Sequence, residues 1–205
     1  MKEVFACDLA GPVSLAVHRT RPSRVLAVRE YSRSNVEKVW RVLQQPQHPN
    51  ISSATDVFKH DGKLYTIGVD FHLTLDHLVA CDVFPCELQL ASILAQVVDG
   101  LSYILVIGLE HQAIECSNIL LGLDGLIQIA ALEQCVERRP DKSQAQSLSA
   151  LTVVTMLLMQ KYAKADGAIG IDDIKRWPVE SNSVQFLSTT TSVATIEDLK
   201  KVGKF

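Results

Sequence analysis

The feature of this sequence that most constrains its fold is a change in hydrophobic period near residue 70. Before that point, short segments such as residues 13–17 alternate apolar and polar side chains with period two, which is typical of half-buried strands. After it, apolar residues between Leu90 and Leu105 follow the i, i+3, i+4, i+7 spacing of a helix. The chain is therefore predicted to be α+β, with a strand-rich first part and a helical second part.

Turn and capping residues predict further elements in the first part of the chain. Residues 25–28 continue the strand pattern. Ser34 and Glu37 have the spacing of a capping box, in which both side chains satisfy free backbone N–H groups at the start of a helix. Asp61-Gly62 predicts a hairpin, because both turn residues tolerate positive φ.

The second part of the chain is predicted to contain three helices and another hairpin. Pro85 is suited to the first turn of the long helix, and Asp124-Gly125 predicts the hairpin. Residues 148–159 are apolar on nearly every face, which predicts a helix buried on all sides. Residues 195–198 repeat the capping-box spacing and predict a last helix.

Charge and composition exclude a protein that holds nucleic acid. The 205 residues carry a net charge of −3, whereas binding through phosphate contacts needs a basic excess. The first part is locally basic, but no aromatic residues interleave with its arginines to stack on bases, so we expect a solvated face there. These arginines are Arg19, Arg21, Arg24, Arg29, Arg33 and Arg41.

The cysteines and the apolar runs indicate the compartment. The five cysteines are an odd number without a C-x-x-C pair, so we expect reduced and mostly buried thiols and no structural zinc. The beginning of the sequence lacks the apolar stretch of a signal peptide. The longest apolar runs, residues 103–109 and 153–159, are too short to span a bilayer. We therefore expect a cytoplasmic protein without membrane contact.

Several segments, taken in order along the chain, are similar to motifs of the eukaryotic protein kinases. The most specific is residues 111–121, His-Gln-Ala-Ile-Glu-Cys-Ser-Asn-Ile-Leu-Leu, which resembles H-R-D-L-K-P-x-N-I-L-L. The others are residues 26–29 (V-A-I-K), 48–51 (the loop after the first-lobe helix), 74–79 (the segment after the hinge), 127–133 (K-I-x-D-F-G) and 147–148 (within D-x-W-S-L-G). Their order and spacing, which cover nearly the whole chain, carry the resemblance.

The resemblance implies a protein kinase-like two-lobed fold. Residues 1–70 would form a small lobe with an antiparallel β-sheet and one helix, and residues 71–205 would form a mainly helical lobe. Only a short stretch separates Glu133 from the predicted buried helix. The activation segment is therefore expected to be shortened, without the A-P-E anchor that shapes a peptide-substrate groove.

The resemblance also implies that the groups that hold a nucleotide are missing from the first lobe. Only Gly11 is kept among three glycines of the phosphate-covering loop, since Ala6 and Asp8 occupy the other two positions. Asp8 would place a negative charge where phosphates should lie. Arg29 stands at the lysine position, and its wide planar fork does not substitute well for a compact ammonium. Val39 stands where the partner glutamate of that lysine belongs.

In the second lobe, the resemblance implies that the proton-accepting group is replaced. His111 and Asn118 are kept, His111 as a brace of the catalytic loop and Asn118 as half of a metal site. The proton-accepting aspartate is replaced by Ala113, and the nearby lysine by Glu115. Loss of a general base alone typically slows a reaction by about 10²–10⁴.

The magnesium-binding aspartate of kinases is replaced by Ala131, and Leu132 and Glu133 follow in place of Phe-Gly. With the base and the metal carboxylate both gone, the resemblance predicts a pseudokinase that acts as a binding, scaffold or regulatory module without phosphotransfer. It implies no catalytic residue, no metal and no cofactor. The expected partner is another protein, such as an active kinase.

Two further hypotheses concern the former nucleotide cleft. If Arg29 is buried it needs a partner, and a charge pair with Glu115 or Glu133 would clamp the lobes together without nucleotide. Alternatively, the more apolar cleft would serve an enzyme of non-kinase chemistry that binds and converts a small, largely apolar molecule. Cys116 lies near His111 in the sequence, as a candidate nucleophile or as a small buried residue.

Overall fold

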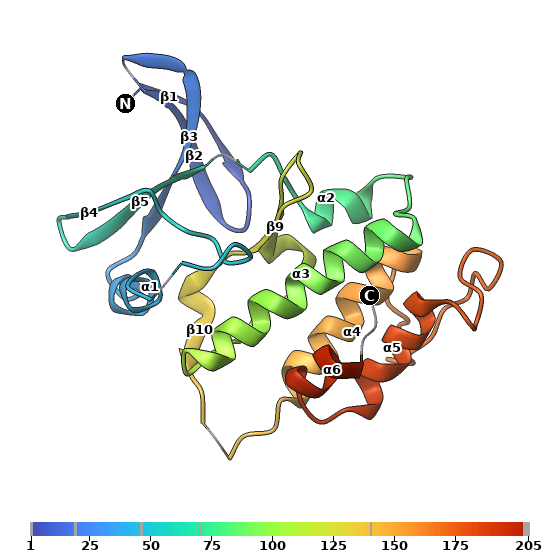
Figure 1. Ribbon diagram of the computed structural model, residues 1–205. Coiled ribbons are helices and arrows are strands. Elements are labelled where there is room, and N and C mark those ends of the chain that lie inside the picture. The colour runs from blue at the N-terminus through green and yellow to red at the C-terminus, as the bar shows by residue number, and fades with distance from the viewer. Residues whose placement is uncertain (1, 19, 46, 70, 140, 203–205) are drawn as a thin grey trace.

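A five-stranded antiparallel sheet forms the first part of the molecule (Figure 1). The computed structural model describes residues 2–18, 20–45, 47–69, 71–139 and 141–202. The strands pair in the order β1-β2-β3-β5-β4. They are β1 (Lys2–Asp8), β2 (Pro12–His18), β3 (Arg21–Tyr31), β4 (Asp56–His60) and β5 (Lys63–Val69). The predicted strands and the hairpin at Asp61-Gly62, where φ is 49° and 75°, are confirmed.

One helix, α1 (Val36–Leu43), lies between β3 and β4 in the chain. The predicted capping box is wrong, because Asn35 is the N-cap and makes no side-chain cap hydrogen bond. The chain already turns before this point, since the Asn35 N–H donates to the Ser32 carbonyl at 2.9 Å. The Ser34 hydroxyl pairs instead with the Ser32 hydroxyl at 2.9 Å. Val39 is fully buried, whereas Glu37 is exposed.

Helices dominate the second part of the chain, and they gather around α3 (Figure 1). The helices are α2 (Leu75–Ala80), α3 (Glu87–Val106), α4 (Ala145–Gln160), α5 (Asn182–Ser192) and α6 (Ile196–Val202). Short strands form two small sheets, β10-β7 and β6-β8-β9. These strands are β6 (Leu73–Thr74), β7 (Leu109–His111), β8 (Ile119–Leu121), β9 (Ile127–Ile129) and β10 (Cys135–Glu137).

The long predicted helix is confirmed as α3, which packs against β7, β9 and the helices α4, α5 and α6. The prediction for Pro85 is wrong, because the helix begins at Glu87 with Cys86 as its N-cap. Among the described residues, α3 is the helix whose length and composition would let it cross a membrane, and half of that stretch is buried inside the protein. Its packing makes it the central helix of the core.

The last helix and its cap are confirmed, but the prediction for residues 148–159 is wrong in one respect. The Asp198 N–H donates to the Thr195 hydroxyl at 3.0 Å at the start of α6. On α4, Ser149 and Val153 are exposed, Val153 by 41%. The helix packs against α2, α3 and α5, and this leaves one stripe of its surface uncovered by the described residues.

One cluster of buried apolar residues joins the sheet to the helices. Val39 of α1 and Leu64 of β5 belong to the same cluster as Leu94 of α3, Leu151 of α4 and Leu199 of α6. The α+β class and the order of its parts are therefore as predicted. The division into two lobes at residue 70 stays a prediction.

All five cysteines are free thiols, but the prediction that most are buried is wrong. Cys116 and Cys135 are buried, whereas Cys81 and Cys86 are exposed. These two are the C-cap of α2 and the N-cap of α3, so they lie at the ends of a surface loop.

Gly100 allows α3 to approach the loop before β4 closely. A Cβ at this position would lie 2.8 Å from the Asn50 carbonyl oxygen and 3.0 Å from Ile129 Cδ1. We expect Gly100→Ala to destabilise the protein by about 1–3 kcal/mol through this clash, although alanine is intrinsically the better helix former by about 1 kcal/mol. Urea unfolding followed by circular dichroism measures the change. Ser92→Ala, at an exposed position of α3, is the control, and a stabilised Gly100→Ala variant would contradict the tight approach.

Candidate functional site

Two residues of the turn between β1 and β2, Leu9 and Ala10, are buried against the rest of the molecule, while Asp8 and Pro12 beside them are exposed. Leu9 and Ala10 in this turn are only 6% and 5% exposed. They belong to a second apolar cluster, separate from the main core, with Val13, Leu15, Ala27, Leu120 and Ala130. Because this cluster takes residues from the sheet and from the segment around β8 and β9, Leu9 fills space between the two.

Arg29 on β3 holds this turn from within. Its Nη1 donates to the Ala10 carbonyl at 3.0 Å, and its Nη2 donates to the Leu9 carbonyl. A turn that cradles phosphate presents N–H groups to its ligand, whereas this turn presents carbonyl oxygens to a guanidinium. The predicted charge pair of Arg29 with Glu115 or Glu133 is not formed among the described side chains.

The N–H group of Gly11, the glycine kept in this turn, is also not available to bind an anion. The Gly11 N–H donates to Asp8 Oδ1 at 3.0 Å, so the carboxylate occupies a donor that a phosphate would use. Gly11 has a φ of 93°, which glycine adopts freely. Ala10 has a φ of 58°, a left-handed conformation that costs an L-residue about 1–2 kcal/mol. The turn therefore persists because its surroundings hold it.

His111 on β7 braces the loop that follows it and is neutral. Its Nδ1 accepts the Ala113 N–H at 3.2 Å, so its Nε2 carries the proton and donates to the Ala130 carbonyl at 2.8 Å. Burial lowers the pKa of His111 below its ordinary value of 6.5, against smaller opposing effects of the Ala130 and Ala131 backbone. Both ring nitrogens are used in backbone contacts, which leaves neither for proton transfer.

Asn118 closes the same loop on itself. Its Nδ2 donates to the Ala113 carbonyl at 3.0 Å, and its backbone N–H donates to the Glu115 carbonyl at 3.0 Å. The Asn118 carbonyl in turn accepts the Ala130 N–H at 2.9 Å. The Glu115 side chain is exposed to solvent. The shape of this loop is thus held by amide and backbone groups rather than by charges.

Ala131 precedes the turn after β9, and Glu133 lies within it. Ala131 is buried with a φ of 53° and precedes the 3₁₀ turn Leu132–Gln134. Oε2 of Glu133 is inaccessible to solvent and has no hydrogen-bond partner in the described part of the chain. Burial raises the pKa of Tyr31 on β3; the charge of Arg29 opposes this rise and that of Glu133 adds to it. Tyr31 is therefore a member of this site that the sequence motifs did not indicate.

The described residues around this loop form no site for a metal ion or for an activated nucleophile. Within the described ranges, no group of three or more His, Cys, Asp or Glu side chains could hold a metal ion. Burial raises the pKa of the Cys116 thiol to about 12, with smaller contributions from Asp76 and Glu115. A thiol that stays protonated near neutral pH is a poor nucleophile, so Cys116 is a small buried residue.

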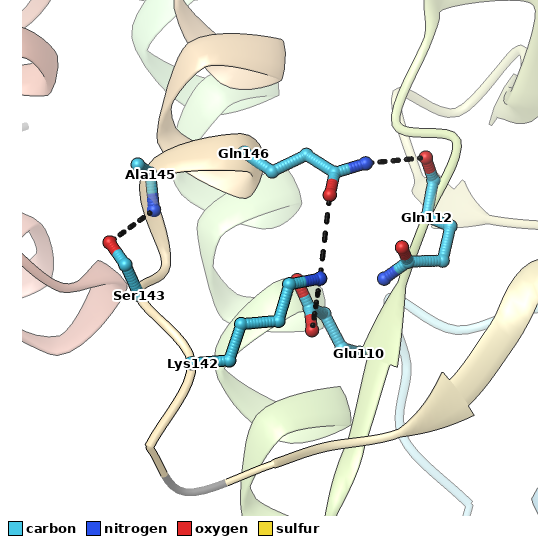
Figure 2. A network of polar contacts seen from close by, with 6 residues as sticks. All are labelled: Glu110, Gln112, Lys142, Ser143, Ala145 and Gln146. Carbon is cyan, nitrogen blue, oxygen red and sulfur yellow. Dashed lines mark hydrogen bonds and ion pairs between the residues drawn. The ribbon is translucent and has the colours of Figure 1, made fainter.

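The short segment between β10 and α4 is anchored by a polar network (Figure 2). Nζ of Lys142 lies 3.3 Å from both carboxylate oxygens of the buried Glu110 and 3.5 Å from Oε1 of Gln146. Nε2 of Gln146 donates to the Gln112 carbonyl at 3.4 Å. These residues hold the segment against β7. No sequence motif marked them, because they pair across a long separation in the chain.

The predicted site residues therefore gather around one region. Gly11 and Arg29 shape the closed turn, whose apolar cluster includes Ala130. His111 and Asn118 bind the backbone of the same Ala130 from the other side.

Next to the closed turn lies a cavity of about 350 Å³. It extends from the sheet, at Ala27 and Gly68, past residues 52–55 to the hairpin between β8 and β9. Its lining combines apolar side chains with polar ones, Arg29 among them. The buried Leu9 of the turn forms part of its wall.

Comparison with known proteins agrees with a kinase-like relationship. No protein-family model matches the chain. Over 112 residues it is 30% identical to the mitogen-activated protein kinase sma-5 of Caenorhabditis elegans. That stretch is 50% of this chain and 21% of the relative, so the chain spans about a fifth of the length of the curated relative it matches.

Loss of the Arg29 guanidinium should release the β1–β2 turn. We expect Arg29→Met to lower the free energy of unfolding by at least about 1.5–3 kcal/mol, since even one hydrogen bond from a charged donor contributes about that much, and to speed amide exchange at Gly11. Urea unfolding and hydrogen exchange measure the two effects. Arg33→Met is the matched control, because Arg33 also donates twice to a backbone carbonyl, that of Asp61, but at an exposed site. Equal effects of the two variants would contradict the role of Arg29.

His111 should make stability depend on pH. The unfolded chain binds a proton as the pH falls through 6.5, while native His111, with its lowered pKa, does not. The free energy of unfolding should therefore fall between about pH 7 and pH 5, by at most about 1.4 kcal/mol per pH unit from this residue. We expect His111→Gln to flatten the dependence of the urea midpoint on pH.

The control for this experiment is His48→Gln. Burial also lowers the pKa of His48, but this ring is only partly buried, so its replacement should flatten the pH dependence less. An unchanged pH dependence in His111→Gln would contradict a neutral His111 imidazole with both ring nitrogens hydrogen-bonded.

Proposed function

We propose that this chain is a pseudokinase, a kinase-like protein that does not transfer phosphate and that acts as a binding, scaffold or regulatory module. The observation that carries the proposal is the β1–β2 turn, which presents carbonyl oxygens rather than N–H groups to Arg29. Its Leu9 and Ala10 carbonyls are bound by Arg29, and its Gly11 N–H is bound by Asp8. The Leu9 and Gly11 N–H groups, which a phosphate-binding loop would offer to phosphate oxygens, are already bound to the Gly11 carbonyl and to Asp8.

The second support is the absence of acidic groups where the kinase resemblance requires them. Ala113 and Ala131 offer methyl groups in place of the base and the metal carboxylate. Phosphoryl transfer depends on positioning and charge neutralisation, and loss of the base alone reduces a rate by about 10²–10⁴. The kept residues His111 and Asn118 are engaged with backbone groups.

The proposed partner is another protein, such as an active kinase. The short segment before α4 leaves Ser149 and Val153 exposed on a helix that is otherwise largely buried. Exposed apolar side chains of this kind can contribute to an interface. The similarity to a mitogen-activated protein kinase over half the chain is compatible with descent from an active enzyme.

An enzyme of another chemistry is the alternative, and the cavity of about 350 Å³ is the observation that favours it. Its size is at the lower end of the range for small-molecule sites, about 300–1,000 Å³. However, the Cys116 thiol stays protonated near neutral pH and so provides no nucleophile. Both ring nitrogens of His111 are hydrogen-bonded to the backbone, so it provides no base. Turnover of a small apolar molecule would decide for the enzyme.

A radiolabel transfer assay tests the proposal. We expect no magnesium-dependent incorporation of phosphate from γ-labelled ATP into the protein itself or into a general substrate. Ala113→Asp together with Ala131→Asp should remain inactive, because the turn still fills the cleft. Magnesium-dependent transfer by the unmodified protein would overturn the proposal, and transfer that Ala113→Asp does not increase would overturn the alignment of residues 111–121 with the kinase motif.

A further inference from the structure

The cavity beside the closed turn has mostly apolar walls. They come from β2, β3, the end of β5 and the hairpin between β8 and β9, and they include Val13, Ala27, Val69, Phe71, Leu120 and Leu126. Such walls favour a hydrocarbon or aryl body over a polar one, because burial of apolar surface contributes about 25 cal/mol per Å². At about 350 Å³ the space suits a molecule smaller than a nucleotide.

One wall of this cavity carries a cation, Arg29, that forms no direct ion pair with a side chain in the described part of the chain. Arg29 lines the cavity and is partly buried. Two of its N–H groups donate to the carbonyls of Leu9 and Ala10, and no carboxylate among the described residues forms an ion pair with it. A guanidinium presents five N–H groups in a planar fork that matches a carboxylate. A partly desolvated positive charge of this kind is stabilised by an anion.

Two other polar residues of the lining, Asp124 and Gln128, do not compete for this role. Asp124 is exposed on the hairpin turn, where its Oδ1 accepts the Leu126 N–H at 3.1 Å. Water and salt therefore screen its charge. Nε2 of Gln128 donates to the Pro49 carbonyl at 2.9 Å. The hydroxyls of Ser52, Ser53 and Thr55 also line the cavity, and they can donate to an oxygen of a ligand.

We propose that this cavity binds a small monocarboxylate with an apolar body, with its carboxylate on Arg29 and its body between the sheet and the β8–β9 hairpin. The inference goes beyond the proposed function and does not rest on it, because a protein that transfers no phosphate can bind such a ligand or lack it. The combination that carries it is a guanidinium without an ion pair among the described residues and largely apolar walls in one cavity.

Calorimetry and thermal shift with simple probes test the inference on the full chain. Octanoate and hexanoate are compared with 1-octanol and 1-hexanol, which have bodies of the same length without the charge, and with acetate, which has the charge without the body. We expect octanoate to bind at least about tenfold more tightly than octanol, which corresponds to a single good ion pair, and acetate not to bind measurably. Equal binding of octanoate and octanol would overturn the proposal.

Two variants locate the site. Arg29→Met should weaken octanoate binding at least about tenfold more than it weakens octanol binding, because release of the turn affects both ligands alike, whereas Arg33→Met, outside the cavity, should change neither. Thr55→Phe fills the cavity from an exposed position and should abolish octanoate binding with Arg29 still in place. It tests the proposal even if Arg29→Met fails to fold. Undiminished binding in Thr55→Phe would place octanoate on the surface and overturn the inference, as would stabilisation by ATP with magnesium alone.

Discussion

The contact between Arg29 and the carbonyls of Leu9 and Ala10 determines what the space between the sheet and the helices can hold. The left-handed Ala10 opposes this arrangement by about 1–2 kcal/mol. Burial of a leucine side chain contributes about 1.5–3 kcal/mol, and each hydrogen bond from a charged donor contributes a comparable amount. The favourable contributions exceed the strain, so the turn closes without any ligand. A lysine at position 29 would have one ammonium in place of the two-pronged fork that spans both carbonyls.

The loop after β7 keeps its shape through hydrogen bonds of the His111 and Asn118 side chains to backbone groups. The hydrogen bonds of the His111 and Asn118 side chains described above all go to backbone groups, namely those of Ala113 and Ala130. Neither contact needs the carboxylates that the kinase resemblance places nearby. The methyl groups of Ala113 and Ala131, which stand where the kinase resemblance places carboxylates, are therefore compatible with a folded loop and add no charge that would need a partner.

Sequence reasoning was most reliable where one local rule decides the structure. The period of apolar residues identified α3, and Asp61-Gly62 identified a hairpin, because side-chain burial and positive φ are read directly from residue type. It was weaker for the site. The motifs indicated which groups are replaced, but no pattern showed that Arg29 would bind the turn at Leu9, or that Lys142 would reach Glu110. Both contacts join residues that are distant in the chain. The exposed stripe on α4 was not predicted for the same reason, because residue type does not show which distant segments cover a helix.

The single core shared by α1, β5 and the helices has a consequence for how the molecule moves. Val39 and Leu64 are fully buried in the same packed interior as the residues of α3, so a hinge rotation that separated sheet from helices would tear that interior open. The cavity already borders solvent, since Thr55 and Val69 in its lining are exposed, so access to it needs no such rotation. A molecule that bound there would enter and leave on the timescale of side-chain and loop motions, rather than on that of a rotation between rigid parts.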